Sequence, residues 1–134
     1  MMEIILLAKG FEEIEAITII DVLRRAEIPV KTVSITENKE VEGAHYISVV
    51  CDETLQNIAP NEIERVILPG GWGGTYALAE NEQVLELIRA VNANHKEIAA
   101  ICAAPYVLDK ADVLKHEYAC YPSVEEQIEH AHYN

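Results

Sequence analysis

Hydrophobic residues in the first third of the chain recur with two different periods. Residues 2–8 form an almost unbroken apolar run, which is typical of a strand buried on both faces. Residues 11–26 repeat their apolar positions with helical spacing, and their glutamates in the first turn and arginines in the last turn match the helix dipole. Residues 29–35 nearly alternate and predict a second strand.

The alternation of strand and helix continues to the end of the chain. Residues 65–69 and 97–101 predict two more buried strands, and residues 81–92 predict a helix between them. Residues 36–60 look irregular apart from a hairpin or short strand near residues 46–50. The remaining predictions are a helix that begins at residues 102–105, a strand at residues 118–121 and a short helix that Ser123 would cap.

This order of elements predicts an α/β sandwich of three layers around a mostly parallel central sheet. A length of 134 residues suits one domain, which we take as residues 1–134. In such sheets ligands bind beyond the carboxyl ends of the strands. Three segments are expected there, namely residues 10–15, 70–74 and 102–105.

Charge and composition narrow the class of partner. The chain has 10 Lys and Arg against 23 Asp and Glu, a net charge of −13, so we expect neither nucleic acid nor an anionic membrane surface as a partner. Its apolar runs are shorter than the ~18–20 residues that span a bilayer, and its start lacks the basic region of a signal peptide. Cys51, Cys102 and Cys120 lack metal-binding spacing and indicate reduced thiols, which predicts a cytoplasmic protein.

Cys102 is the strongest candidate for chemistry. It lies between an apolar strand and a helix start, a junction like the elbow that presents the nucleophile of hydrolases. Amide groups at a helix N-terminus stabilise a thiolate, so a low pKa is expected for this thiol. The alternative is an inert thiol, because cysteine is among the most buried residue types.

Glu15 is the second candidate. It shares a helical stripe with apolar Ile19, Val22 and Ala26, and burial there would favour its protonated form, which can donate a hydrogen bond. The alternative is a solvated carboxylate beside the neighbouring glutamates.

The glycine-rich segment 70–74 has neither the spacing of a dinucleotide-binding loop nor the lysine of a P-loop. Its glycines would let backbone amides face a ligand or an oxyanion, although an ordinary flexible turn explains the segment as well. None of the five histidines has the spacing of a zinc-binding helix, so we expect no metal and no organic cofactor.

Three separated motifs resemble the ThiJ/PfpI (DJ-1) family, in its order and at its spacing. They are residues 10–16 with residues 21–26, residues 66–71 and residues 99–105. The resemblance covers essentially the whole chain. It implies a flavodoxin-like fold that is usually dimeric.

The resemblance also implies roles for single residues. Cys102 would be the reactive cysteine, and Glu15 would be the protonated carboxyl that hydrogen-bonds its thiolate. The backbone amides of Gly71 and Ala103 would form the oxyanion pocket, with Gly70 beside it.

Departures from the family pattern bear on the chemistry. Ala103 stands where the peptidase branch carries a histidine base, which disfavours protease activity. Tyr121 occupies a pocket position where some members carry histidine, as in the bacterial ThiJ branch. His45 lies roughly where some relatives carry an arginine near the pocket. Members of the family continue beyond the position of Asn134, so we expect an incomplete domain. Either a separate C-terminal fragment completes it as a partner, or the protein is a truncated variant.

The function implied by the resemblance is a cofactor-independent, cysteine-dependent enzyme of the glyoxalase or deglycase type. Its substrate would be a small reactive aldehyde such as methylglyoxal, converted to a hydroxy acid, and its protein partner would be a second copy of the chain. The alternative is a redox sensor or stress chaperone whose cysteine is reversibly oxidised and that has little turnover.

Overall fold

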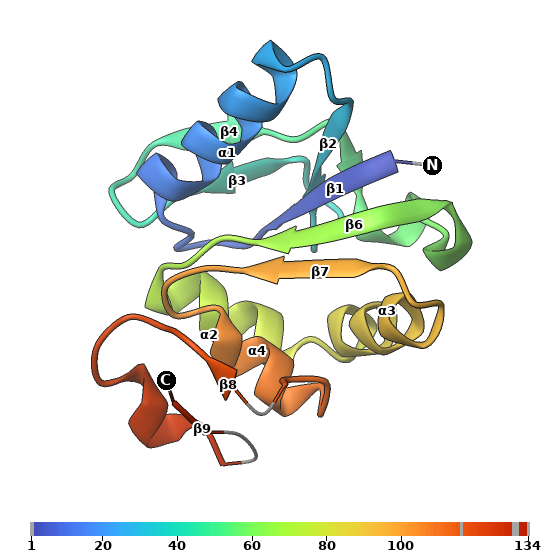
Figure 1. Cartoon of the computed structure of the whole chain (residues 1–134). Helices are drawn as coiled ribbons and strands as arrows, with labels where there is room; N and C mark the ends of the chain where they lie inside the picture. Colours follow the sequence, from blue (N-terminus) through green and yellow to red (C-terminus); the bar gives the residue numbers. More distant parts are fainter. Residues whose placement is uncertain (1, 116, 130–131, 134) are drawn as a thin grey trace.

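Five parallel strands form the central sheet of the computed structural model, which describes residues 2–115, 117–129 and 132–133. The strand order is β5-β2-β1-β6-β7, and every neighbouring pair is parallel, as predicted (Figure 1). The strands are β1 (Met2–Leu7), β2 (Val30–Ser34), β5 (Glu53–Thr54), β6 (Ile63–Leu68) and β7 (Glu97–Ala100).

Helices cover both faces of this sheet and complete the three predicted layers (Figure 1). One face carries α1 (Glu13–Arg25) together with the antiparallel hairpin of β3 (Glu40–Glu42) and β4 (Ser48–Val50). The other face carries three helices, α2 (Trp72–Glu80), α3 (Glu82–Ala93) and α4 (Pro105–Lys110). In the part of the chain that the structure describes, no helix is long and apolar enough to cross a bilayer.

Short elements fill the remaining connections. They are the 3-10 turns η1 (Leu55–Asn57), η2 (Pro60–Glu62) and η3 (Val124–Gln127), and the parallel pair β8 (Glu117–Tyr118) and β9 (His132–Tyr133). The predicted cap at Ser123 is wrong, because this residue has a left-handed φ of 80° and its side chain makes no capping hydrogen bond.

Local patterns correctly predict the buried face of α3. All five apolar positions expected to face inward are buried, and the Asn81 side chain caps the helix by accepting from the Val84 amide at 3.1 Å. The buried residues are Val84, Leu85, Leu87, Ile88 and Val91.

The sequence pattern misses α2 completely. This helix begins at Trp72 and carries two glycines in its first turn, although glycine is the weakest helix former after proline. A Cβ atom at Gly74 would lie 2.9 Å from the backbone of Phe11, so close packing against the β1–α1 connection requires glycine there. Tertiary contact therefore outweighs helix propensity at this point.

The stripe expected to be buried on α1 is wrong in its C-terminal half. Ala16 and Ile20 face the core and Ile19 packs half-buried against it, whereas Val22 is 57% exposed and Ala26 is exposed. The helix is turned so that Glu13, rather than Glu15, is its buried carboxyl. Glu15 is half-buried and reaches the carboxyl edge of the sheet from the flank of the helix.

Candidate active site

The three predicted ligand-binding segments meet at the point where the order of the strands reverses, because β2 lies on one side of β1 and β6 lies on the other. The sheet order places β1 next to β6, and the loops that follow these strands touch, with the Glu12 amide donating to the Gly70 carbonyl at 3.0 Å. The connection after β7 brings in Cys102. Such a switch point is the usual ligand position in an open α/β sheet.

Close backbone contact makes the glycine-rich loop a packed structure. Gly71 has a φ of 93°, and a Cβ atom there would lie 2.5 Å from the Gly10 carbonyl oxygen. Only glycine combines this left-handed conformation with so near a neighbour. The loop after β6 is therefore held against the loop after β1, and the flexible-turn interpretation does not describe it.

Gly70 joins the two candidate side chains. Its amide donates to Glu15 Oε1 at 2.8 Å. A Cβ atom at Gly70 would lie 2.5 Å from that same oxygen, 2.6 Å from Cys102 Cβ and 3.1 Å from Cys102 Sγ. The carboxyl of Glu15, the Gly70 backbone and the thiol thus pack directly against one another.

Cys102 occupies a strained backbone position. Its φ is 62°, a left-handed conformation that is uncommon for a residue with a Cβ atom. It lies between β7 and α4, with Pro105 at the start of that helix as predicted. The half-buried thiol is consequently presented at a sharp strand-to-helix turn.

The electrostatic environment of the thiol differs from the expected one. Burial first, and then the hydrogen bond and charge of Glu15, raise the pKa of Cys102, while the amides of Ala103 and Gly71 act in the opposite direction. The low pKa expected from the sequence is therefore absent while Glu15 is charged. Helix α4 has only six residues, so its dipole gives the sulfur less help than a long helix would.

Two adjoining hollows open at the thiol, with volumes of about 440 and 350 Å³. Glu15, Cys102 and Tyr121 line both of them. The larger hollow adds Ala100, Ile101, Ala119 and Cys120, and the smaller adds Glu12, Gly71, Trp72 and Ala103. A small aldehyde has room beside the sulfur.

The structure places most of the predicted site residues together. Tyr121 lines both hollows together with Cys102, and its amide donates to the Cys102 carbonyl at 2.8 Å. His45 is not among the residues that line the two hollows. Sequence reasoning missed Trp72 and gave Cys120 little weight, although its place next to Tyr121 could have indicated it.

His45 instead binds the buried carboxylate of Glu13. Its Nδ1 lies 2.9 Å from Glu13 Oε1, and the backbone amides of His45 and Ile47 donate to Oε2 at 2.7 and 3.3 Å. Burial would raise the pKa of Glu13, but the hydrogen bonds outweigh it and lower this pKa to about 2. The pKa of His45 is raised by its hydrogen bond to Glu13 and by the charge of Glu12.

Ligand atoms of Glu12, Glu13 and His45 lie within 4.8 Å of one another, the spacing of a metal site. The hydrogen bonds to Glu13 already explain this cluster, as an anchor between α1 and the β3–β4 hairpin.

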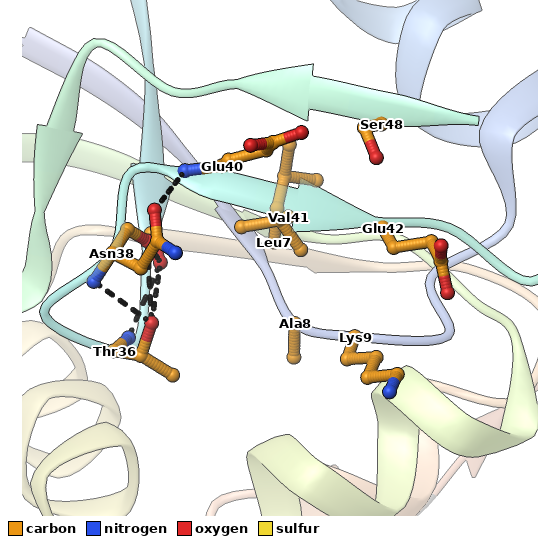
Figure 2. A pocket seen from close by; sticks show the side chains of 10 residues that line it. Leu7, Ala8, Lys9, Thr36, Asn38, Glu40, Val41, Glu42 and Ser48 are labelled. Carbon is orange, nitrogen blue, oxygen red and sulfur yellow. Dashed lines mark hydrogen bonds between the residues drawn. The ribbon is translucent and has the colours of Figure 1, made fainter. Parts of the chain in front are cut away.

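Figure 2 shows a separate hollow of about 380 Å³ at the carboxyl ends of β1 and β2. Lys9, Glu40 and Glu42 give it charged walls, while Thr36 and Asn38 bond to their own loop. Cysteine and histidine are not among the residues that line it.

Comparisons with known proteins agree with this fold. The profile of the DJ-1/PfpI family matches residues 3–134. Protein dj-1beta of Drosophila melanogaster is 37% identical over 126 residues, which are 93% of this chain and 67% of that protein. Protein DJ-1 homolog B of Arabidopsis thaliana is 35% identical over 99 residues, which are 74% of this chain and 23% of that protein. The chain thus spans two thirds or less of these relatives.

Solved structures are similar over nearly the whole chain. A DJ-1 superfamily protein from Salmonella typhimurium superposes with a TM-score of 0.91 at 35% identity, covering 100% of this chain and 74% of that one. The crystal structure of Drosophila melanogaster DJ-1beta gives a TM-score of 0.91 at 36% identity, with 98% and 70% covered. The predicted flavodoxin-like fold is confirmed.

Proposed function

This chain belongs to the DJ-1/PfpI family, and from that premise we propose that it is a cysteine-dependent enzyme acting on small reactive aldehydes. The observation that carries the proposal is the set of groups around the sulfur of Cys102. The carboxyl of Glu15 and the amides of Gly71 and Ala103 all interact with the Cys102 thiol at the switch point of the sheet.

Each of these groups has a task in the conversion of methylglyoxal to lactate. The Cys102 thiolate attacks the aldehyde carbon, a C–S bond forms, and the carbonyl electron pair moves to oxygen. The amides of Gly71 and Ala103 hold that oxyanion. Glu15 gives its proton to that oxyanion, which completes the hemithioacetal, and the carboxylate so formed moves a proton from the former aldehyde carbon to its neighbour. Water then hydrolyses the resulting thioester to free the thiol.

The proton on Glu15 matters for the first step. A charged Glu15 raises the pKa of the thiol, whereas a protonated Glu15 donates to the sulfur and favours the thiolate. Cys102 and Glu15 therefore share one proton, which moves from the thiol to the carboxyl as the sulfur attacks. A reduced thiol is required, so we place the reaction in a reducing compartment such as the cytoplasm.

Carbonyl chemistry fits the site better than peptide hydrolysis. The residue after the nucleophile is Ala103, whose methyl side chain cannot act as the base of a Cys-His pair. The hollows at Cys102, of about 440 and 350 Å³, also suit a small substrate more than an extended peptide.

The test is lactate formation from methylglyoxal by the wild-type chain and its Cys102→Ser variant. We expect turnover to fall to background in the variant. Cys51→Ala is the matched control, because Cys51 is buried in the core between α1 and the sheet. The turnover of this variant should match that of the wild type. Full turnover by Cys102→Ser would refute the proposal.

Glu15→Gln separates proton transfer from thiol reactivity. Glutamine keeps an oxygen for the Gly70 amide but removes the charge and the exchangeable proton. Lactate formation should fall by about 100-fold, the usual contribution of a general acid–base group. The thiol pKa should fall at the same time, because the charge that raises it is gone, and iodoacetamide should then alkylate Cys102 faster near neutral pH. Slower alkylation would contradict this assignment.

A second candidate function is a redox sensor with little turnover. The half-buried Cys102 favours it, because peroxide can reach that sulfur and cannot easily reach the buried Cys51. Absence of lactate formation in the wild type, with oxidation confined to Cys102, would favour the sensor over the enzyme.

A further inference from the structure

A second thiol lies in the same hollow as Cys102. Cys120 lines the larger hollow beside Glu15, Cys102 and Tyr121. The hydrogen bond from the Tyr121 amide to the Cys102 carbonyl, 2.8 Å long, fixes the backbone of the two cysteines side by side. The path from one Cα atom to the other consists of that hydrogen bond and two covalent bonds on each side of it. This brings them close to the ~4.4–6.8 Å that a disulfide spans, and both residues line one hollow.

The segment that carries Cys120 is anchored to the body of the protein. Val124 is fully buried, the Tyr76 hydroxyl donates to Gln127 at 2.8 Å, and the Glu129 amide donates to Asp109 at 3.2 Å. Cys120 is thus held beside Cys102 by contacts on its C-terminal side as well as by the Tyr121 amide.

A base is available to Cys120. Its Sγ donates to a carboxylate oxygen of Glu125 at 3.9 Å. Burial, followed by the charge of Glu125, raises the pKa of Cys120, so the thiol carries its proton until that base removes it. Cys51 offers no such arrangement, since burial raises its pKa to about 11 and it packs into the opposite core.

We propose that Cys120 is a resolving cysteine, which closes a disulfide with Cys102 after a hydroperoxide has oxidised that residue. The Cys102 thiolate attacks the outer peroxide oxygen, the O–O bond breaks, and an alcohol or water leaves, so that the sulfur becomes a sulfenic acid. Cys120 then gives its proton to Glu125 and attacks the sulfenic sulfur. The S–S bond forms, the S–O bond breaks, and water leaves with one proton from the site.

The disulfide protects the nucleophile. One hydroperoxide has been reduced and two thiols oxidised, so a dithiol reductant restores both cysteines. Without Cys120, the sulfenic acid would continue to the irreversible sulfinic form. The inference rests on the proposed function only in taking Cys102 as the reactive thiol, and it adds reversible inactivation by hydroperoxides.

Peptide mapping tests this step directly, because trypsin separates the three cysteines. Cys51 falls in peptide 40–65, Cys102 in peptide 97–110, and Cys120 in the peptide that begins at residue 116. One equivalent of hydrogen peroxide should join the last two peptides in a chain that still migrates as a monomer on a non-reducing gel. Dithiothreitol should separate them again.

Cys120→Ser and Cys51→Ser are the matched variants. With Cys120→Ser, peptide 97–110 should carry sulfinic acid at peroxide doses that leave the wild type disulfide-bonded, whereas Cys51→Ser should still form the disulfide. Near-UV circular dichroism checks that each variant is folded.

Sulfinic acid on Cys102 in the wild type, with Cys120 still reduced, would overturn the inference. The readout does not depend on lactate formation. A disulfide without turnover would therefore reject the carbonyl enzyme alone, and turnover without a disulfide would reject only the resolving role.

Discussion

Gly70 is the residue on which the geometry at the sulfur depends most closely. It lies between the Glu15 carboxyl and the Cys102 side chain, at distances that leave no room for a methyl group. Its φ is not in the left-handed region, so its role is close approach and not backbone freedom. A change there should alter the site more than the fold.

We expect Gly70→Ala to lower lactate formation by about 100-fold, because the methyl group would push apart the carboxyl and the thiol that must exchange a proton. Overpacking should also destabilise the protein by roughly 1–3 kcal/mol. Steady-state kinetics and urea unfolding measure the two effects.

Gly73→Ala is the control, because a Cβ atom added there would meet no atom nearer than 3.3 Å. Gly73 also lies in α2, where alanine is a better helix former than glycine. Its turnover should stay within a factor of a few of the wild type. Equal losses in both glycine variants would show that the effect is on folding and not on the pair of reacting groups.

The β3–β4 hairpin is an element whose attachment depends on charge. It is held to the start of α1 by Glu13, which accepts hydrogen bonds from the ring and backbone of His45 and from the Ile47 amide. Both partners have shifted pKa values, lowered to about 2 for Glu13 and raised for His45. The contact is therefore an ion pair only within a window of pH.

The direction of the pH dependence follows from these shifts. The raised pKa of His45 means that its stabilising contribution is complete below its ordinary value of 6.5 and is lost as pH rises through the folded-state pKa. The lowered pKa of Glu13 means that its contribution is complete above 4.5 and is lost as pH falls toward about 2. Both contributions are present together between these two ordinary values.

We expect His45→Gln to lower the free energy of unfolding more at about pH 5.5 than at about pH 9, because only the protonated ring is held by the two glutamates. The effect should be small, since the His45 side chain is 67% exposed. Urea unfolding at the two pH values measures it. The exposed His95, changed to Asn, is the control and should show no such difference. A larger loss at the alkaline pH would contradict the ion pair.

The outer surface of the molecule is unusually apolar along α1. Ile14, Ile17 and Val22 are 76%, 44% and 57% exposed and lie on one side of this helix, turned away from the sheet. An exposed apolar face of this kind marks an interaction surface. Among the described residues β7 pairs with β6 alone, and Ile101 beyond it is 45% exposed.

We expect the protein to form a homodimer through the outer face of α1. Sedimentation equilibrium should give twice the chain mass of 14.9 kDa for the wild type and a single chain mass for Ile14→Lys with Ile17→Lys, because the added charges cannot be buried in an apolar interface. Val50→Lys, on the exposed side of β4, is the control and should remain dimeric. A monomeric wild type would rule out the assignment.

Local sequence already defines the central strands, α3 and the position of Cys102 in the fold. A strand buried on both faces is apolar along its length, as β1 is, and an amphipathic helix repeats its apolar residues, as α3 does. The place of Cys102 between a strand and a proline-initiated helix is likewise readable without coordinates. These features are local because the periodicity of the chain directly reports burial.

Only the tertiary structure reveals the other features. Helix α2 contains glycines that its close packing requires, and α1 directs Glu13 inward to accept hydrogen bonds from amides of a distant hairpin. Cys120 lies beside Cys102 because a backbone hydrogen bond joins their two segments. The raised pKa of Cys102 has the same origin, because it depends on burial and on a carboxyl from another element. Contacts between residues far apart in the chain leave no periodic trace in the sequence, and they decide how the thiol of this protein reacts.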